Sequence, residues 1–222
     1  EYGIKLIIGS EFNLDEELRL VFLAPNRIGY GQICNLITMA RRRAEKGKYS
    51  LALKDLEFAT DQCIVIWLPE EPRAHHELLA DGLQTLFKDR LWLGLEIFPN
   101  GKAISCYEHG FKLSQKLGLP MVATGDVHMH HPDRKPLLDV ISAVRMRQSI
   151  QLAGRLLPTN REKYLRPIKN IAELYPADML RASCAIANLC QFSLDELRYE
   201  YPEELVPPGL TPSAYLRQLT YL

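Results

Sequence analysis

The sequence lacks the compositional marks of several classes of protein. Its 222 residues carry 27 basic and 27 acidic side chains, so no net charge gives the chain a general attraction for nucleic acid. No apolar run is long enough to span a bilayer, and the first residues do not form a secretory signal peptide. Internal repeats and low-complexity tracts are also missing. We therefore expect no association with membranes.

Cysteine is scarce and follows no pattern. The five cysteines are Cys34, Cys63, Cys106, Cys184 and Cys190, and no two of them form a Cys-x-x-Cys pair. An odd number at irregular spacing does not suit a disulfide framework. The sequence therefore predicts reduced thiols in a cytoplasmic protein.

What is present suits one substantial hydrophobic core, because 47% of the residues are hydrophobic and 24% are charged. Apolar runs typical of strands alternate with segments of helical periodicity. Strands are predicted over residues 4–8, 18–24, 63–68, 91–98 and 121–123, and helices over 29–47, 71–87, 105–117, 136–147, 171–175 and 177–190. This alternation predicts a parallel α/β architecture.

The helix predicted over residues 136–147 has a regular apolar stripe. Its members are Leu137, Val140, Ile141 and Val144, which recur at helical spacing. We expect this stripe to face the core and Asp133 to cap the helix.

The clearest chemical pattern lies in residues 119–133. A short apolar strand ends at Gly125, and Asp126, His128 and His130 follow at alternate positions. In an extended segment these three side chains point to the same side. The carboxyl ends of strands are where α/β folds place their chemistry, and a carboxylate with imidazoles suits zinc, manganese or iron. The alternative is a turn residue at Asp126 and solvated histidines in a loop.

Three other side chains allow two interpretations each. Glu11 follows the first predicted strand and is either a metal ligand or a charge on the rim. Glu96 lies near the end of the fourth strand, where the same choice holds. Cys63 is either a thiolate ligand or a small buried residue. Basic side chains also crowd the end of the helix at 29–47, where they either contact phosphate or suit the helix dipole in solvent.

Four segments of the chain, residues 3–12, 23–36, 123–130 and 192–207, carry a family resemblance. The last segment has the sequence Phe-Ser-Leu-Asp-Glu-Leu-Arg-Tyr-Glu-Tyr-Pro-Glu-Glu-Leu-Val-Pro. With these segments the chain resembles the PHP (polymerase and histidinol phosphatase) domain of bacterial C-family DNA polymerases. The nearest branch is the error-prone one, which is related to the alpha subunit of polymerase III. The resemblance extends over essentially all of the chain.

The resemblance implies a distorted seven-stranded α/β barrel with a metal site at the carboxyl ends of its strands. The chain begins at Glu1 directly in a strand-like pattern, so we expect an incomplete (β/α)7 barrel without its N-terminal strands. Residues 1–150 are expected to form the barrel portion and residues 151–191 a C-terminal helical extension. Residues 192–222 are then a linker that leads toward the polymerase palm.

Four residues match metal ligands of the family by position. They are Glu11, Cys63, Asp126 and His128, whereas His130 matches none. Arg19 stands where the family has a histidine, and an arginine cannot ligate a metal. We expect Arg19 to pair with Glu11 or Asp126 and to replace the charge of a cation. Zinc or manganese would then bind weakly or not at all, while magnesium is expected for the parent polymerase.

The first functional hypothesis is a fragment of an error-prone, translesion DNA polymerase that serves as a structural and interaction module in DNA synthesis and repair. Such a fragment would lack polymerase activity. It would meet DNA through its parent, accessory translesion proteins are possible partners, and open strand edges are a route to a homo-oligomer. The alternative is a metal-dependent phosphoesterase, either a 3′–5′ exonuclease or a pyrophosphatase, that uses the residual metal site.

Overall fold

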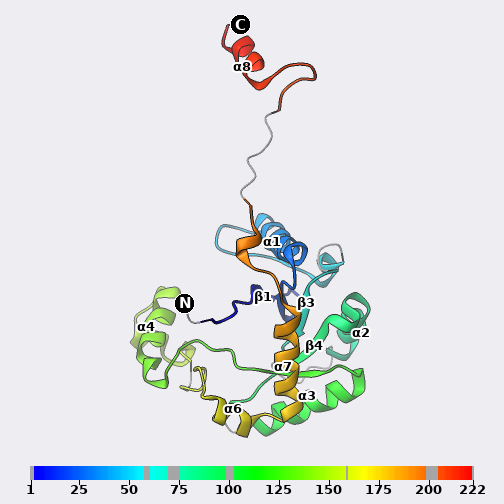
Figure 1. The fold of residues 1–222 in the computed structure, drawn as a ribbon. Helices are drawn as coiled ribbons and strands as arrows, with labels where there is room; N and C mark the ends of the chain where they lie inside the picture. The colour runs from blue at the N-terminus through cyan, green and yellow to red at the C-terminus, as the bar shows by residue number, and fades with distance from the viewer. Residues whose placement is uncertain are drawn as a thin grey trace.

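The computed structural model describes residues 3–57, 61–69, 76–98, 103–158, 160–198 and 205–221. These residues form an α/β domain around an open, mixed sheet of five strands (Figure 1). The strands are β1 (Gly9–Asn13), β2 (Arg19–Leu23), β3 (Ile64–Trp67), β4 (Leu91–Glu96) and β5 (Met121–Thr124), and they are ordered as in the sequence. The seven-stranded barrel stays a prediction.

The sheet is parallel in one half only. β3, β4 and β5 run parallel, and the helices α2 (His76–Phe87) and α3 (Ala103–Leu117) form their crossovers. β1 and β2 are antiparallel to each other, as are β2 and β3, so the prediction of a parallel sheet is wrong here. Only residues 14–18 join β1 to β2, and a parallel connection needs a much longer crossover.

The first strand, β1, begins at Gly9, directly after the residues 4–8 that were predicted to form it. Residues 4–8 are outside the ladder, and Ile4 and Leu6 are 84% and 67% exposed. The register explains this shift, because Gly9 pairs with Leu23 at the very end of β2. One further hydrogen bond joins the Ala24 amide to the Ile8 carbonyl, and the chain then leaves the sheet at Pro25.

Side-chain alternation gives the sheet two apolar faces. Helix α1 (Arg27–Arg42) and the crossover helices pack on one face, where Phe22, Trp67 and Phe87 are fully buried. Helix α7 (Ala177–Leu189) covers the other face, where it contacts β5 and packs Ile186 against the strands. β3 is buried on both faces, as expected for a strand in the centre of a sheet.

The remaining helices lie outside this sandwich. They are α4 (Lys135–Arg145), α5 (Ile150–Ala153), α6 (Ile168–Leu174) and α8 (Pro212–Thr220). The sequence did not predict α8, which begins with Thr211 accepting a hydrogen bond from the Ala214 amide. Within the described ranges, no helix has the length and apolar character needed to cross a membrane.

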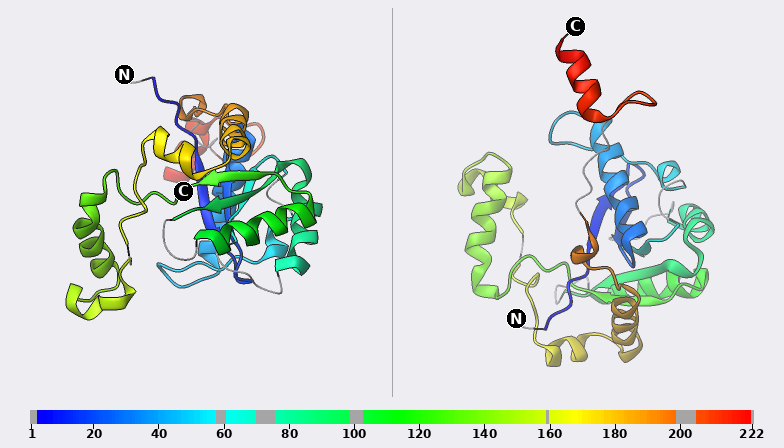
Figure 2. Two further views of the ribbon diagram at one scale, coloured as in Figure 1. Left: turned by 90° about the horizontal axis from the view of Figure 1, so that it is seen from below. Right: turned by 45° about the horizontal axis from the view of Figure 1, so that its top comes forward.

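The described residues between 130 and 161, which include α4 and α5, form an excursion that we call the α4 arm. The arm lies to one side of the sheet in every view (Figures 1 and 2). Its apolar stripe faces solvent, so the predicted inward orientation is wrong. The exposed members are Leu137, Val140, Ile141 and Val144, with exposed fractions of 50%, 43%, 58% and 70%. The stripe has no core to face, because α4 packs on its own arm through α5 and a short 3-10 turn at Pro132–Arg134.

The predicted cap of this helix is also wrong. Asp133 lies inside the 3-10 turn, and its amide hydrogen-bonds the ring of His131, which caps that turn instead.

Candidate functional site

Three charged side chains meet on the face of the sheet that α7 covers. Glu11 comes from β1, Arg19 is the first residue of β2, and Glu96 is the last residue of β4. Their neighbours Phe12 and Leu20 point into the opposite core, as the two-residue period of a strand requires. The sheet therefore brings two carboxylates and a guanidinium together from three strands.

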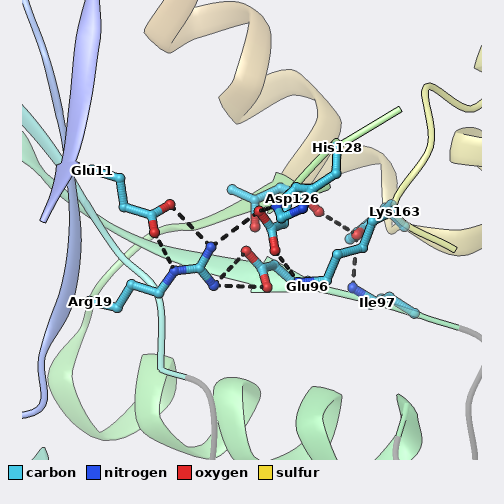
Figure 3. Close-up of polar contacts among 9 residues, drawn as sticks. Glu11, Arg19, Glu96, Ile97, Asp126, His128 and Lys163 are labelled. Atoms are coloured by element: carbon cyan, nitrogen blue, oxygen red, sulfur yellow. Dashed lines mark hydrogen bonds and ion pairs between the residues drawn. The ribbon is translucent and has the colours of Figure 1, made fainter. Parts of the chain in front are cut away.

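Arg19 is the centre of the cluster (Figure 3). Its Nε and Nη2 atoms donate to the two oxygens of Glu11 over 2.9 and 3.1 Å. Its Nη1 atom donates to both oxygens of Glu96 over 3.1 and 3.2 Å. A third carboxylate, that of Asp126, lies 3.4 Å from Nη2. Only 10% of the Arg19 side chain is exposed, and its contacts to Glu96 and Asp126 are largely shielded from solvent, whereas Glu11 lies at the exposed side of the cluster.

Asp126 reaches the cluster through an unusual backbone conformation. Its φ angle is 40°, in the left-handed region that few non-glycine residues adopt. From there one carboxylate oxygen accepts from His128 Nε2 over 2.8 Å, and the other accepts from Lys163 Nζ. Backbone strain of this kind persists only where surrounding contacts hold it. The contacts to Arg19, His128 and Lys163 supply that hold.

Burial and charge act in opposite directions on these groups. Burial alone would lower the pKa of Arg19, but the hydrogen bond to Glu11 and the three carboxylates hold that pKa above its ordinary value. Burial would raise the pKa of Asp126, and Lys163 and His128 outweigh it and lower that pKa. For Glu96 burial is the stronger influence, so its pKa is raised despite Arg19. The cluster is therefore built around a permanent cation.

Lys163 ties the α4 arm to this cluster. The arm returns to the sheet beside its own start, where Met129 and Tyr164 form a parallel bridge. The Lys163 carbonyl accepts from the amides of His128 and Met129, and the Met129 carbonyl accepts from the Leu165 amide. Residues 128–129 and 163–165 thus form the base of the arm. Lys163 contacts this base through its backbone and Asp126 through its side chain.

The structure brings most of the predicted site residues together. Glu11, Arg19, Asp126 and His128 lie in one cluster, and Arg19 pairs with both of the partners that were predicted as alternatives, Glu11 and Asp126. The prediction that His130 points to the same side as Asp126 and His128 is wrong. The left-handed turn at Asp126 breaks the extended segment, and His130 is exposed.

Cys63 lies elsewhere. It precedes β3, at the strand end where Ile64 pairs with Leu23, whereas Arg19 is four residues away along β2. At about 3.3 Å per residue, roughly 13 Å of strand separates the two positions. The Cys63 thiol is fully buried, donates to the Gly29 carbonyl, and has a pKa raised by burial to about 12. These surroundings suit a small buried residue.

Sequence reasoning missed two residues of the site. Lys163 lies in an irregular stretch with no recognisable pattern and reaches Asp126 across 37 positions. Tyr175 donates to the Thr124 carbonyl and accepts from the Ile97 amide, which joins the ends of β4 and β5. Neither contact left a signal in the sequence. Glu96 was recognised only as a choice between site and rim.

The residues of the cluster do not fit a metal ion. The oxygens that would ligate it are directed at Arg19 and Lys163, whose nitrogens occupy the space between the carboxylates (Figure 3). Within the part of the chain that the structure describes, no group of three or more His, Cys, Asp or Glu side chains is arranged to hold a metal. The ion pairs of the cluster join β1, β2, the end of β4 and the loops that carry Asp126 and Lys163.

Fold and site thus define an α/β domain whose strand ends are held together by an ion-pair cluster. No family model matches the chain. The chain is 48% identical to an error-prone DNA polymerase of Methylococcus capsulatus, over 98% of its own length and 21% of that protein. Error-prone DNA polymerases of Saccharophagus degradans and Pseudomonas savastanoi are 41% and 44% identical over similar shares. The chain is homologous to a segment of error-prone DNA polymerases, and it spans about a fifth of the length of these relatives.

Proposed function

We propose that the chain is the PHP domain of an error-prone DNA polymerase and serves that enzyme as a structural and interaction module. The observation that carries the proposal is the position of Arg19. It stands among Glu11, Glu96 and Asp126, where a metal-dependent enzyme would hold its cation. The extent of similarity to error-prone DNA polymerases supports the same assignment.

The same proposal covers the fold. The sheet is an incomplete form of the PHP-type barrel, and β1 is the edge to which further strands would be added. In support, β1 pairs with β2 alone among the described strands, so its outer edge offers unpaired amides and carbonyls. A second copy of the chain could use this edge as well.

Polymerisation itself would then belong to other parts of the enzyme. Nucleotidyl transfer uses two metal ions that are clamped by carboxylates, and the carboxylates of the described cluster are engaged by arginine and lysine. The purified chain should therefore not extend a primed template in the presence of magnesium and nucleotides. Template-dependent extension that survives repurification would contradict the proposal.

Metal content is the second test. Elemental analysis of the purified chain should find no stoichiometric zinc or manganese, and a variant with Asp126→Asn and His128→Ala should give the same result. Stoichiometric metal that is lost in this variant would contradict the role assigned to Arg19.

The metal-dependent phosphoesterase is the second candidate, and one observation favours it. Asp126 and His128 are in contact, and 43% of the His128 side chain is exposed, so a ligand pair of this type is accessible. Any hydrolysis of phosphate esters by this site should disappear in Asp126→Asn. Activity that is unchanged in the variant would come from a contaminant.

A further inference from the structure

The α4 arm carries a net positive charge, although the whole chain has a net charge of zero. Residues 130–161 include six basic and two acidic side chains. The two acids already have partners, because Asp139 pairs with Lys135 over 2.6 Å and Asp133 lies 3.9 Å from Arg161. Four arginines remain that are exposed and have no ion pair among the described residues. They are Arg134, Arg145, Arg147 and Arg155.

These four arginines follow one side and the end of α4. Arg134 directly precedes the helix and Arg145 is its last residue, eleven positions later. This spacing is about three turns, so both lie on the same side of the helix, roughly 16 Å apart along its axis. Arg147 follows the helix in a left-handed turn, and Arg155 comes from the 3-10 turn after α5, which packs on α4.

The helix dipole explains only part of this arrangement. Cations near the C-terminus of a helix are stabilising, which accounts for Arg145 and Arg147. Arg134 stands at the N-terminal end, where the dipole disfavours a cation, and no acidic side chain in the first turn offsets it. Its exposure without a partner points to an anionic ligand from outside the arm.

The composition of the arm indicates which class of anionic ligand it would bind. Guanidinium groups suit phosphate oxygens, which they bind through paired hydrogen bonds. Proteins that bind single strands without sequence preference stack the bases on aromatic rings, and residues 130–161 contain no Phe, Tyr or Trp. A second copy of the arm would bring like charges together. The arm also lies to one side of the sheet, which leaves it accessible to a long polymer (Figure 2).

We infer that the α4 arm binds the phosphate backbone of duplex DNA without reading its sequence. The choice of DNA as the polyanion rests on the proposed function, whereas the phosphate chemistry rests on the arm itself. Because such binding releases counterions, it should depend steeply on salt. The arm would bind the duplex through charge alone and would make no contact that distinguishes one base from another.

The test is fluorescence anisotropy of a labelled duplex of about 24 base pairs, titrated with the 222-residue chain between about 50 and 200 mM salt. EDTA is present throughout, so that no metal chemistry contributes. The test variant carries Arg134→Gln, Arg145→Gln, Arg147→Gln and Arg155→Gln. The control variant carries Arg27→Gln, Arg42→Gln, Lys46→Gln and Lys54→Gln, which removes four exposed charges from the region of α1 and leaves the arm intact. Circular dichroism and thermal unfolding should show that both variants are folded.

The arm variant should bind the duplex roughly 100-fold more weakly at about 100 mM salt, and its log–log salt slope should fall by about 3 to 4. The control variant should retain most of the slope of the unaltered chain. Equal losses in the two variants would overturn the inference, because net charge alone would then explain binding. Failure of the unaltered chain to bind at low salt, or tighter binding of a single strand than of a duplex, would overturn it too. None of these outcomes bears on primer extension or metal content, so a failure here is separable from a failure of the proposed function.

Discussion

Lys163 donates a hydrogen bond to the carboxylate of Asp126, 37 residues earlier in the chain. Its backbone carbonyl meanwhile accepts from the amides of His128 and Met129. One residue thus joins the ion-pair cluster at the strand ends to the base of the α4 arm. The position of the arm relative to the sheet is therefore coupled to the charges of the cluster.

Removal of the Lys163 charge should loosen the base of the arm. Lys163→Met retains the aliphatic stem and removes the ammonium group, so Asp126 loses its strongest lowering influence. We expect a loss of roughly 1–2 kcal/mol in the free energy of unfolding. Amide exchange at His128, Met129 and Leu165 should become about 5–30-fold faster. Lys48→Met is the control, because its pair with Glu45 is exposed and should contribute little. Unchanged exchange at the base of the arm would contradict the coupling.

Replacement of Arg19 should be the most damaging single change in the cluster. Arg19→Met leaves three carboxylates around a buried position with Lys163 as the remaining cation. Removing one partner of a buried ion pair typically costs roughly 3–5 kcal/mol, and we expect a loss of this size at neutral pH. Adding Glu96→Gln to this variant should recover part of the lost stability, because one of the mutually repelling carboxylates is then neutral. Denaturant unfolding of the two single variants and the double variant measures this coupling.

The Arg19→Met variant should also respond to pH in a characteristic way. Burial already raises the pKa of Glu96 in the unaltered chain, and Arg19 is the main opposing influence. Without Arg19 the folded state should bind a proton more readily than the unfolded chain does. The free energy of unfolding of the variant should therefore rise as the pH falls from 7 toward 5. A variant whose stability falls over this range would contradict the assignment.

Asp126 should contribute stability that is lost in acid. Its pKa is lowered in the folded state, so the unfolded chain takes up the proton first as the pH falls below about 4. The difference in stability between the unaltered chain and Asp126→Asn should be roughly 1–3 kcal/mol at pH 7 and should close toward pH 3. Asp133→Asn is the control, because its side chain is 77% exposed and its difference should stay near zero. Urea unfolding across this pH range is the measurement.

The sequence predicted the elements of the sheet better than their arrangement. Four of the five strands lie where apolar runs indicated them, and three of these four are central strands, which are buried by neighbours on both sides. The run at residues 4–8 is equally apolar, yet the short connection between Asn13 and Arg19 sets the register and places β1 after it. The stripe on α4 shows a second limit. Periodicity indicates which residues share a face of a helix, but it does not say whether that face meets the core.

The candidate site was predictable where its residues follow strands. Asp126 comes two residues after β5, as the strand pattern indicated, and family position pointed to it as well. Glu11 is the central residue of β1 and does not follow a strand as predicted, and Arg19 begins β2, so family position rather than strand pattern pointed to these two. Lys163 could not be found in this way. It belongs to a loop whose position depends on the bridge between Met129 and Tyr164, and such long-range backbone contacts leave no local pattern.

The reactivity of the Cys63 thiol distinguishes its two possible roles, a buried structural residue and a metal ligand. Burial raises its pKa to about 12, so almost none of it is thiolate at pH 8, whereas Cys184 is exposed. A thiol-alkylating reagent should therefore label Cys184 in the native chain and reach Cys63 only on unfolding, as peptide mass spectrometry would show. Added zinc should not alter the labelling of Cys63, because its position lies at the opposite end of β3 from the carboxylates. Rapid native labelling that zinc suppresses would instead make Cys63 a ligand, and the arrangement of the site would have to be revised.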